Sequence, residues 1–301
     1  MYQKFIKKIL SLQLLTINEI EQLCEKVIEI LIKESNFPNI SSPVSVCGDI
    51  HGQIFDLVDL FRREGDPSKQ KYIFLGNYVD RGEYSTECIF LLIIYKILYP
   101  SNIFLVRGNH EQKNISKTYG LYHETLKKYN VNIWRLLCEV FSFFNIGCIV
   151  DGRIFCVHGG ISPKTISLDK LKRLNRFVIN ANNEYEDILW SDPHDDKGFK
   201  ESNRHKGFLF GGDVSNIFLE CNDLTNIIRS HQFAFEGYKF HFPDRNVVTV
   251  WGAPDYLGKF GNPGSFMKVE EDLEISCQRL VIYNNAIRNV DNMKDLYSEK
   301  Y

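Results

Sequence analysis

Short apolar runs recur along the chain, and polar or glycine-rich residues follow almost every one of them. These strand candidates lie at residues 44–47, 72–75, 103–106, 154–157, 226–228 and 247–251. Helical periodicity separates them, most clearly at residues 85–99 and 134–144. Because strands alternate with helices over the first half of the chain, the pattern predicts an α/β fold.

The segment before the first strand candidate predicts two amphipathic helices. Thr16 and Glu19 have the spacing of a capping box that begins the second of them. A signal peptide is disfavoured, because Gln13 interrupts the apolar run and no small-residue cleavage site follows. The longest apolar stretch, residues 89–95, is far shorter than the roughly 18 residues of a membrane span, so we expect no membrane partner.

Composition favours an ordinary globular protein. Of the 301 residues 44% are hydrophobic and 25% are charged, and the formal net charge of -2 argues against a nucleic-acid partner. No repeat or linker interrupts the chain, so we expect one domain over residues 1–301, with helices over about 1–35 and an irregular tail over about 283–301. The charged run Asp195, Asp196 and Lys197 is typical of a solvated loop.

The eight cysteines include no CxxC pair and no zinc-like spacing with histidine. Several lie in apolar runs, for example Cys47 and Cys156, where a free thiol acts as a small hydrophobe. Reduced, mostly buried cysteines predict a cytoplasmic or nuclear location.

The chemistry is concentrated directly after the strand candidates. Five of them end in clusters that supply Asp49 and His51, then Asn77, Asp80 and Arg81, then Asn109 and His110, then His158, and finally His231. Open α/β sheets bind ligands at the carboxyl ends of their strands. Any one of these histidines alone favours a structural role; together they predict a dinuclear metal site with nitrogen and oxygen ligands. Four histidines lack such a context and are expected to be structural: His123, His194, His205 and His241.

Seven motifs occur in a fixed order: GDIHGQ, GNYVDRG, RGNHE, HGG, WSDP, RSHQ and APDY. In order and spacing they resemble the phosphoprotein phosphatase family over roughly residues 20–280. The segments LIKESN, EGYKF and VVTVWGAP are similar to its 2A-like branch, and within that branch to the protein phosphatase 6 group. The resemblance implies a serine/threonine phosphatase catalytic subunit with a calcineurin-like metallophosphoesterase fold, a central β-sandwich flanked by helices.

The resemblance also implies roles for single residues. Asp49, His51 and His231 would hold one divalent ion, Asn109 and His158 would hold the second, and Asn77 stands where the family has a bridging aspartate. The ions would be manganese, iron or zinc. His110 would be the general acid, oriented by Asp80; Arg81 and Arg204 would hold the phosphate, and Tyr256 would line the pocket.

The chemistry of such a site is consistent with these roles. Two ions can hold a bridging hydroxide, because metal coordination lowers the pKa of water to about 7. The leaving alkoxide of serine or threonine needs a proton, which a histidine held by a carboxylate can supply. The expected partners are phosphoproteins and regulatory or scaffold subunits.

The sequence departs from the family pattern in three places. Asn77 replaces the bridging aspartate, Asp255 and Leu257 change the APDY loop, and the chain ends in LYSEKY instead of the Tyr-Phe-Leu tail of the branch. Three alternatives therefore stay open beside a phosphatase of full or reduced activity. They are a metallophosphoesterase for nucleotides or nucleic acids, a binding module without catalysis, and, with little support from the charge, a nucleic-acid binder.

Overall fold

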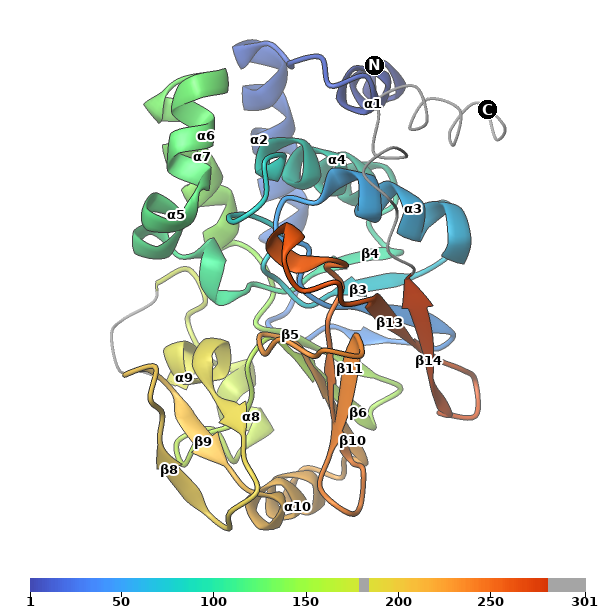
Figure 1. Ribbon diagram of the computed structural model, residues 1–301, viewed down its shortest axis with the longest axis vertical. Helices are drawn as coiled ribbons and strands as arrows, with labels where there is room; N and C mark the ends of the chain where they lie inside the picture. The colour runs from blue at the N-terminus through green and yellow to red at the C-terminus, as the bar shows by residue number, and fades with distance from the viewer. Residues whose placement is uncertain (179–183, 281–301) are drawn as a thin grey trace.

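Two β-sheets packed face to face form the centre of the computed structural model, which describes residues 1–178 and 184–280 (Figure 1). The six-stranded sheet contains, in spatial order, β1 (Asn39–Ile40), β5 (Gly147–Val150), β6 (Ile154–Val157), β10 (Asn226–Arg229), β12 (Val247–Val250) and β11 (Tyr238–His241). The five-stranded sheet contains β14 (Ile275–Leu280), β13 (Gly264–Val269), β2 (Val44–Cys47), β3 (Tyr72–Phe74) and β4 (Ile103–Leu105). A small third sheet contains β7 (Asp192–Pro193), β9 (Phe208–Phe210) and β8 (Phe199–Glu201).

Apolar side chains from both large sheets fill the interior of the sandwich. Val46 and Ile73 of one sheet share a buried cluster with Cys156, Ile228 and Val248 of the other. The outer faces are covered as well, so strands such as β2 and β6 are buried along their whole length. Strands buried on both faces have continuous apolar sequences, which explains why these runs were recognisable.

Helices cover both outer faces of the sandwich. The helices are α1 (Tyr2–Leu10), α2 (Ile17–Leu31), α3 (Ile54–Glu64), α4 (Ser85–Leu98), α5 (Lys113–Tyr119), α6 (Leu121–Lys128), α7 (Val131–Ser142), α8 (Leu168–Lys172), α9 (Glu184–Trp190) and α10 (Gly212–Cys221). Residues of α1 to α4, α6 and α7 pack with Phe74 and Leu105 on the five-stranded sheet. Residues of α8 to α10 pack with Phe155 and Ile227 on the six-stranded sheet. The predicted β-sandwich flanked by helices is confirmed.

The predicted elements agree with the structure, with small shifts at their ends. All six strand candidates are strands, and the helix predicted at 85–99 is α4. The helix predicted at 134–144 begins earlier, at Val131, because the Asn130 side chain accepts hydrogen bonds from the backbone N–H groups of Asn132 and Ile133. The β13–β14 hairpin was not predicted; β14 is an edge strand whose side chains are mostly accessible, so it lacks an apolar run.

The two predicted N-terminal helices and the free, mostly buried cysteines are also present. Thr16 and Glu19 form the capping box of α2. All eight cysteines are free, and five of them are buried. In the part of the chain that the structure describes, no helix is long and apolar enough to cross a membrane. The predicted irregular tail lies outside the described residues.

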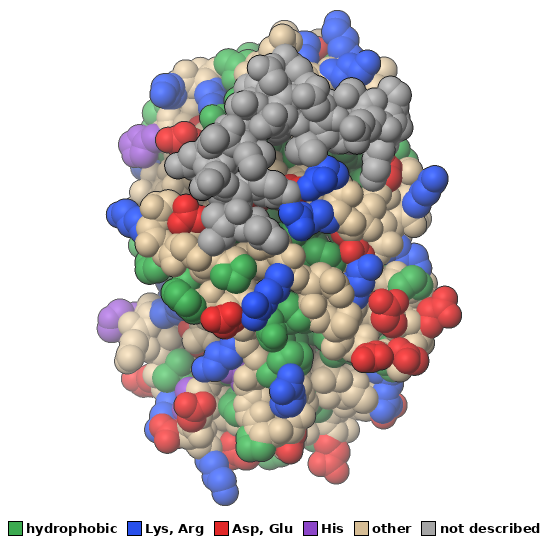
Figure 2. Space-filling model, turned by 45° about the vertical axis from the view of Figure 1, so that its right-hand side comes forward, with side chains coloured by type: hydrophobic (Ala, Val, Ile, Leu, Met, Phe, Trp, Pro, Cys, Tyr) green, Lys and Arg blue, Asp and Glu red, His purple; other side chains and the backbone are tan. Residues whose placement is uncertain are grey.

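Charged side chains are spread over the surface. Figure 2 shows lysines and arginines interspersed with carboxylates on one face, without a continuous basic stripe. Asp195, Asp196 and Lys197 lie in an exposed loop after β7, as predicted.

Candidate active site

The carboxyl ends of six strands lie at one edge of the sandwich. β2, β3 and β4 run parallel to one another in the first sheet, as do β6, β10 and β12 in the second. The segments that follow these strands carry the predicted site residues. Residues far apart in the sequence therefore meet at one edge.

Asp49 and His51 form the part of the site that follows β2. Both side chains are buried, and His51 Nε2 lies 3.3 Å from Asp49 Oδ2. His51 Nδ1 donates to the Val79 carbonyl at 3.0 Å, and although burial opposes it, the hydrogen bond with Asp49 raises the pKa of His51. The Ser230 hydroxyl, 2.5 Å from Asp49 Oδ1, fixes the carboxylate.

Asn109, His158 and His231 form a second group of ligand atoms. Asn109 Oδ1 lies 2.9 Å from His158 Nε2 and 3.1 Å from His231 Nδ1. His158 Nδ1 donates to the Leu75 carbonyl at 2.7 Å, so its Nε2 is an acceptor that faces another acceptor. Acceptor atoms this close favour a cation beside them.

This grouping differs from the predicted division of the ligands. His231 was expected to share an ion with Asp49 and His51, but its ring lies 5.0 Å from the His158 ring and contacts Asn109. The reason is topological: β10, which precedes His231, pairs directly with β6, which precedes His158. His231 therefore belongs with Asn109 and His158.

Burial and neighbouring charges set the protonation of these groups. Burial lowers the pKa of His158 to about 4 and, together with Arg204, holds the pKa of His231 well below its usual range. Burial alone would raise the pKa of Asp49, but the hydrogen bond with His51 brings it below its usual value. Two neutral imidazoles and an ionised carboxylate are the protonation states that metal ligands require.

Asn77 lies between the two groups, and hydrogen bonds fix its amide. Asn77 Oδ1 accepts from the His110 backbone N–H at 3.0 Å, and Asn77 Nδ2 donates to Asp49 Oδ2 at 2.9 Å. The opposite orientation would place the amide NH₂ against the His110 N–H, which is also a donor. The atom directed toward Asp49 is thus a nitrogen that cannot bind a cation.

Glu111 supports this part of the site and was not identified from the sequence. Its carboxylate accepts hydrogen bonds from the backbone N–H groups of Asn77, Tyr78 and Gly108 at 2.8, 2.9 and 2.9 Å. It thereby fixes the loops after β3 and β4 relative to each other. The RGNHE motif contained this residue, but only the structure shows its partners.

His110 and Asp80 form a buried pair. His110 Nδ1 lies 2.7 Å from Asp80 Oδ2, and Asp80 Oδ1 accepts from the Leu121 N–H at 2.7 Å. Burial lowers the pKa of His110 well below its usual range and raises the pKa of Asp80 to about 7. The Tyr119 ring packs beside His110, with 5.5 Å between ring centroids. A protonated Asp80 donates to Nδ1 and leaves the proton of the neutral imidazole on Nε2.

Arg81 and Arg204 reach the site from distant parts of the sequence. Arg81 stacks on the Tyr119 ring at 4.3 Å, and the charges of both arginines act on His110. Arg204 Nε donates to Asp192 Oδ2 at 2.7 Å. Both guanidinium groups remain accessible, as anion binding requires.

Asp192 and Arg229 position Arg204, and the sequence did not assign them a role. Arg229 is fully buried and donates to Asp192 Oδ1 at 2.7 Å and to the Gly159 carbonyl at 2.6 Å. Asp192 thus links the buried arginine to the accessible one. The WSDP and RSHQ motifs contain both residues, which was the available signal.

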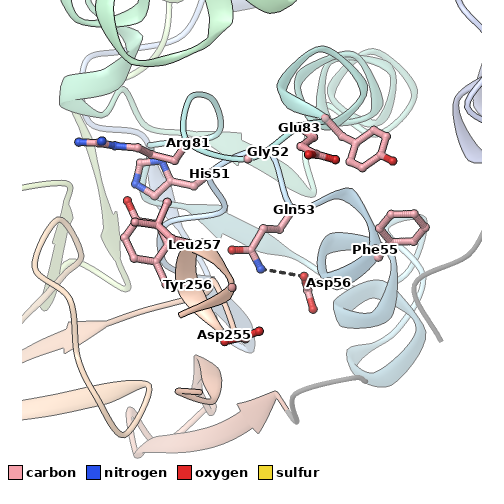
Figure 3. Close-up of a pocket in the computed structure, with 13 residues that line it drawn as sticks. His51, Gly52, Gln53, Phe55, Asp56, Arg81, Glu83, Asp255, Tyr256 and Leu257 are labelled. Carbon is pink, nitrogen blue, oxygen red and sulfur yellow. Dashed lines mark hydrogen bonds between the residues drawn. The ribbon is translucent and has the colours of Figure 1, made fainter. Parts of the chain in front are cut away.

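A cavity of about 490 Å³ opens beside His51, Arg81 and Tyr256 (Figure 3). The Tyr256 ring lies 5.3 Å from the His51 ring and 4.9 Å from the Trp251 ring. Asp255 and Leu257, the departures from the family pattern, adopt the left-handed conformation, with φ of 42° and 58°. The loop places Tyr256 at the mouth of the site.

The remaining histidines do not join the site. His241 is buried and its Nε2 lies 2.8 Å from the Thr249 hydroxyl. His194 Nδ1 accepts from the Asp196 N–H at 3.1 Å, within the loop after β7. No hydrogen bond or ion pair joins His123 or His205 to the site among the described residues, so the structural interpretation is retained for all four.

The ligand set as a whole accommodates metal ions at all but one position. Within residues 1–178 and 184–280, no three His, Cys, Asp or Glu side chains form a metal-binding group by themselves. Asparagine oxygen must therefore contribute, and Asn109 is oriented to do so. His231 Nδ1 lies 3.1 Å from Asn109 Oδ1. The other ring nitrogen of His231, Nε2, is buried and has no hydrogen-bond partner among the described residues. Asn77 does not fit as a bridge in its present orientation.

Comparisons with known proteins find similar sequences over most of the chain. Residues 42–234 match the family model described as calcineurin-like phosphoesterase. The chain is 48% identical to serine/threonine-protein phosphatase PP1-1 of Saccharomyces cerevisiae, covering 90% of this chain and 88% of that protein. It is 46% identical to serine/threonine-protein phosphatase ppe1 of Schizosaccharomyces pombe, covering 85% of each.

A solved structure shares the whole architecture. It is a protein serine/threonine phosphatase from Saccharomyces cerevisiae described as similar to human phosphatase PP5. The TM-score is 0.88 at 30% identity, with 95% of this chain and 98% of that chain covered.

Proposed function

Because this chain belongs to the serine/threonine-protein phosphatases of the calcineurin-like phosphoesterase family, we propose that it hydrolyses phosphoserine and phosphothreonine in proteins. The observation that carries the proposal is the convergence of two ligand groups, an Asp–His pair and two accessible arginines at one sheet edge. The fold implies a dinuclear centre of divalent ions. We infer manganese, iron or zinc, which suit imidazole and oxygen ligands.

In this proposal the site residues bind the metal ions, bind the phosphate or supply a proton. Asn109, His158 and His231 would hold one ion, and Asp49 and His51 the other. When bound, the ions supply a hydroxide nucleophile at neutral pH and neutralise phosphate charge. Arg81 and Arg204 bind the phosphate oxygens, and His110, held by Asp80, gives a proton to the leaving seryl or threonyl oxygen.

A panel of substrates tests the proposal. Phosphoserine and phosphothreonine peptides should release phosphate at a higher kcat/KM than mononucleotides or dinucleoside polyphosphates do. The Asn77→Asp variant should be assayed beside the unaltered chain, because it places an acidic residue at the position that does not fit a bridging ligand. Faster hydrolysis of nucleotides by both proteins would favour the nucleotide-phosphoesterase alternative.

The orientation of Asn77 favours a second candidate, a phosphoprotein-binding module with little turnover. Its amide nitrogen lies where a ligand oxygen is needed, while the arginines and the Tyr256 pocket are intact. Binding of phosphopeptides without release of phosphate, in the presence of added Mn²⁺, would identify this alternative.

A further inference from the structure

A second cavity, of about 640 Å³, lies near the site and shares no lining residue with the cavity beside Tyr256. Residues of α5 and α7 line one side of it, and Glu186 of α9 and Lys206 before β9 line the other. Figure 1 shows α5 above α9 at this place. Five of its lining residues carry positive charge, and we call them the basic pocket: Arg107, Lys113, Lys117, Arg135 and Lys206.

The positive charge of the basic pocket is only partly neutralised. Glu186 is the carboxylate in the lining, and it pairs with Lys206 at 2.5 Å. Lys113, Lys117 and Arg135 are exposed, and none of the three forms an ion pair with another residue that the structure describes. Five cations against one carboxylate leave a net charge of +4. Lysines kept close together without carboxylates raise the local concentration of anions.

Aromatic contacts keep two of the cations in place. Lys113 Nζ lies 5.8 Å from the Trp134 ring centroid, and Lys206 Nζ lies 5.3 Å from that of Trp190. Arg107, buried in the floor, donates through Nε and Nη2 to the Glu111 carbonyl at 3.1 and 3.0 Å. Lys113 and Arg107 are thus held by neutral partners, so their charge stays available to a ligand, whereas Lys206 also pairs with Glu186.

The basic pocket borders the phosphate site directly. The Trp190 ring that lies under Lys206 is 5.6 Å from the ring of His231. Gln112 Oε1, in the lining, accepts from Trp190 Nε1 at 3.3 Å. Lys117 is on the same short helix as Tyr119, which packs on His110 and Arg81.

The cavity beside Tyr256 has the opposite balance of charge, because three carboxylates and one arginine, Arg81, line it. Three carboxylate residues, Asp56, Glu83 and Asp255, line the cavity shown in Figure 3. A peptide whose phosphoresidue occupies the centre would therefore meet cations on one side and carboxylates on the other. Such a field discriminates between sequences through their flanking charges.

We propose that the basic pocket binds acidic side chains that flank the phosphoresidue on one side, so that the preferred substrates are acidic phosphoprotein segments. This rests on the proposed function, because it describes the neighbourhood of the same phosphate site. The recognising chemistry is lysine and arginine against carboxylate oxygens.

Peptide binding, measured apart from turnover, tests the proposal. The probes are three fluorescein-labelled peptides that carry a non-hydrolysable phosphonate in place of phosphoserine. The first has glutamates on the N-terminal side of the phosphonate, the second has glutamates on its C-terminal side, and the third has glutamines on both sides. The dissociation constants are measured by fluorescence anisotropy. At low salt we expect one of the two glutamate peptides to bind at least about tenfold more tightly than the glutamine peptide. This difference in affinity should shrink at 1 M salt, where the Debye length is about 3 Å.

Charge reversal assigns the preference to the basic pocket. In Lys113→Glu/Lys117→Glu the tenfold preference should fall to about one, while hydrolysis of a small aryl phosphate should stay unchanged. The matched control is Lys4→Glu/Lys7→Glu, which makes the same charge change on exposed positions of α1 and should keep the preference.

The two proposals fail in different ways. Equal affinity for all three peptides, or a preference that survives in Lys113→Glu/Lys117→Glu, overturns the basic pocket proposal and leaves the phosphatase proposal intact. Failure of both the natural chain and Asn77→Asp to release phosphate from any phosphopeptide overturns the proposed function, while the binding ratios still decide the inference about the basic pocket.

Discussion

At the residue scale, the hydrogen bonds of Asn77 have the largest consequence for chemistry. Its amide nitrogen donates to Asp49 where a bridging oxygen would be needed, so two divalent ions would repel each other without a shared negative charge. Asn77→Asp should raise metal affinity at least about 100-fold and raise phosphopeptide turnover with it, since losing even a partner of a ligand changes affinity by about 10- to 100-fold.

Metal content by elemental analysis and phosphate release measure this effect together. Asn175→Asp, which adds the same charge on an exposed loop, is the control. If Asn77→Asp changes neither metal content nor turnover, our account of Asn77 is wrong.

His110 is the second residue whose role can be isolated. His110→Ala should lower kcat on phosphoserine peptides by about 10² to 10⁴-fold, because a general acid contributes that much, while metal content stays the same. An aryl phosphate has a good leaving group and should lose much less. Equal losses on both substrates would contradict the assignment of His110 as the acid that protonates the leaving oxygen.

The accessible arginines make a separate prediction about anion binding. Arg81→Ala and Arg204→Ala should each weaken inhibition by phosphate or vanadate about 10-fold or more, because each removes charge-assisted hydrogen bonds worth about 1.5 to 3 kcal/mol. Arg245→Ala, whose guanidinium stacks on Phe240 at 4.3 Å, is the control. Unchanged inhibition constants in both variants would refute the assignment of Arg81 and Arg204 as phosphate-binding residues.

At the scale of elements, Gly48 controls how closely β2 approaches the second sheet. A Cβ at this position would lie 2.3 Å from the Val250 carbonyl oxygen and 2.8 Å from Ser230 Oγ. Gly48→Ala should therefore lower the free energy of unfolding by about 1 to 3 kcal/mol and displace Asp49 from Ser230. Urea unfolding and metal titration measure the two effects.

The control for Gly48 is Gly152→Ala. Gly152 has a φ of 70°, and a Cβ there would meet nothing within 4 Å, so alanine at this position adds backbone strain alone. It should lower stability modestly and leave metal affinity unchanged. If Gly48→Ala behaves like Gly152→Ala in both measurements, close approach of the strands is not what positions Asp49.

At the scale of the whole molecule, the ligands join the two sheets. Asp49 follows β2 of the five-stranded sheet, and His158 follows β6 of the six-stranded sheet. A bound ion should therefore stabilise the entire fold: Mn²⁺ at 100 times its Kd adds about 2.7 kcal/mol to the free energy of unfolding. We expect Tm of Asn77→Asp to rise with Mn²⁺ and to fall again with a chelator.

Removing one metal ligand from each sheet tests whether both sheets contribute to this stabilisation. Asp49→Ala and His158→Ala, each combined with Asn77→Asp, should both reduce the rise in Tm. A rise that depends on one sheet alone would mean that the ions do not link the two halves of the sandwich.

The sequence by itself determined the elements and the chemical content of the site. Strands buried on both faces need continuous apolar residues, so β2, β6 and β12 could be predicted from short runs. Ligand types after successive strands, including Asp49 and His158, indicated the metal chemistry because parallel strands bring their carboxyl ends to one edge.

Only the tertiary structure decided which of these residues are partners. His231 and Asn109 are 122 positions apart and meet because β10 pairs with β6, a grouping that differs from the predicted division of the ligands. The orientation of the Asn77 amide depends on the His110 backbone N–H, 33 positions away. Such contacts are set by the packing of the two sheets, and no local pattern of apolar and polar residues specifies that packing.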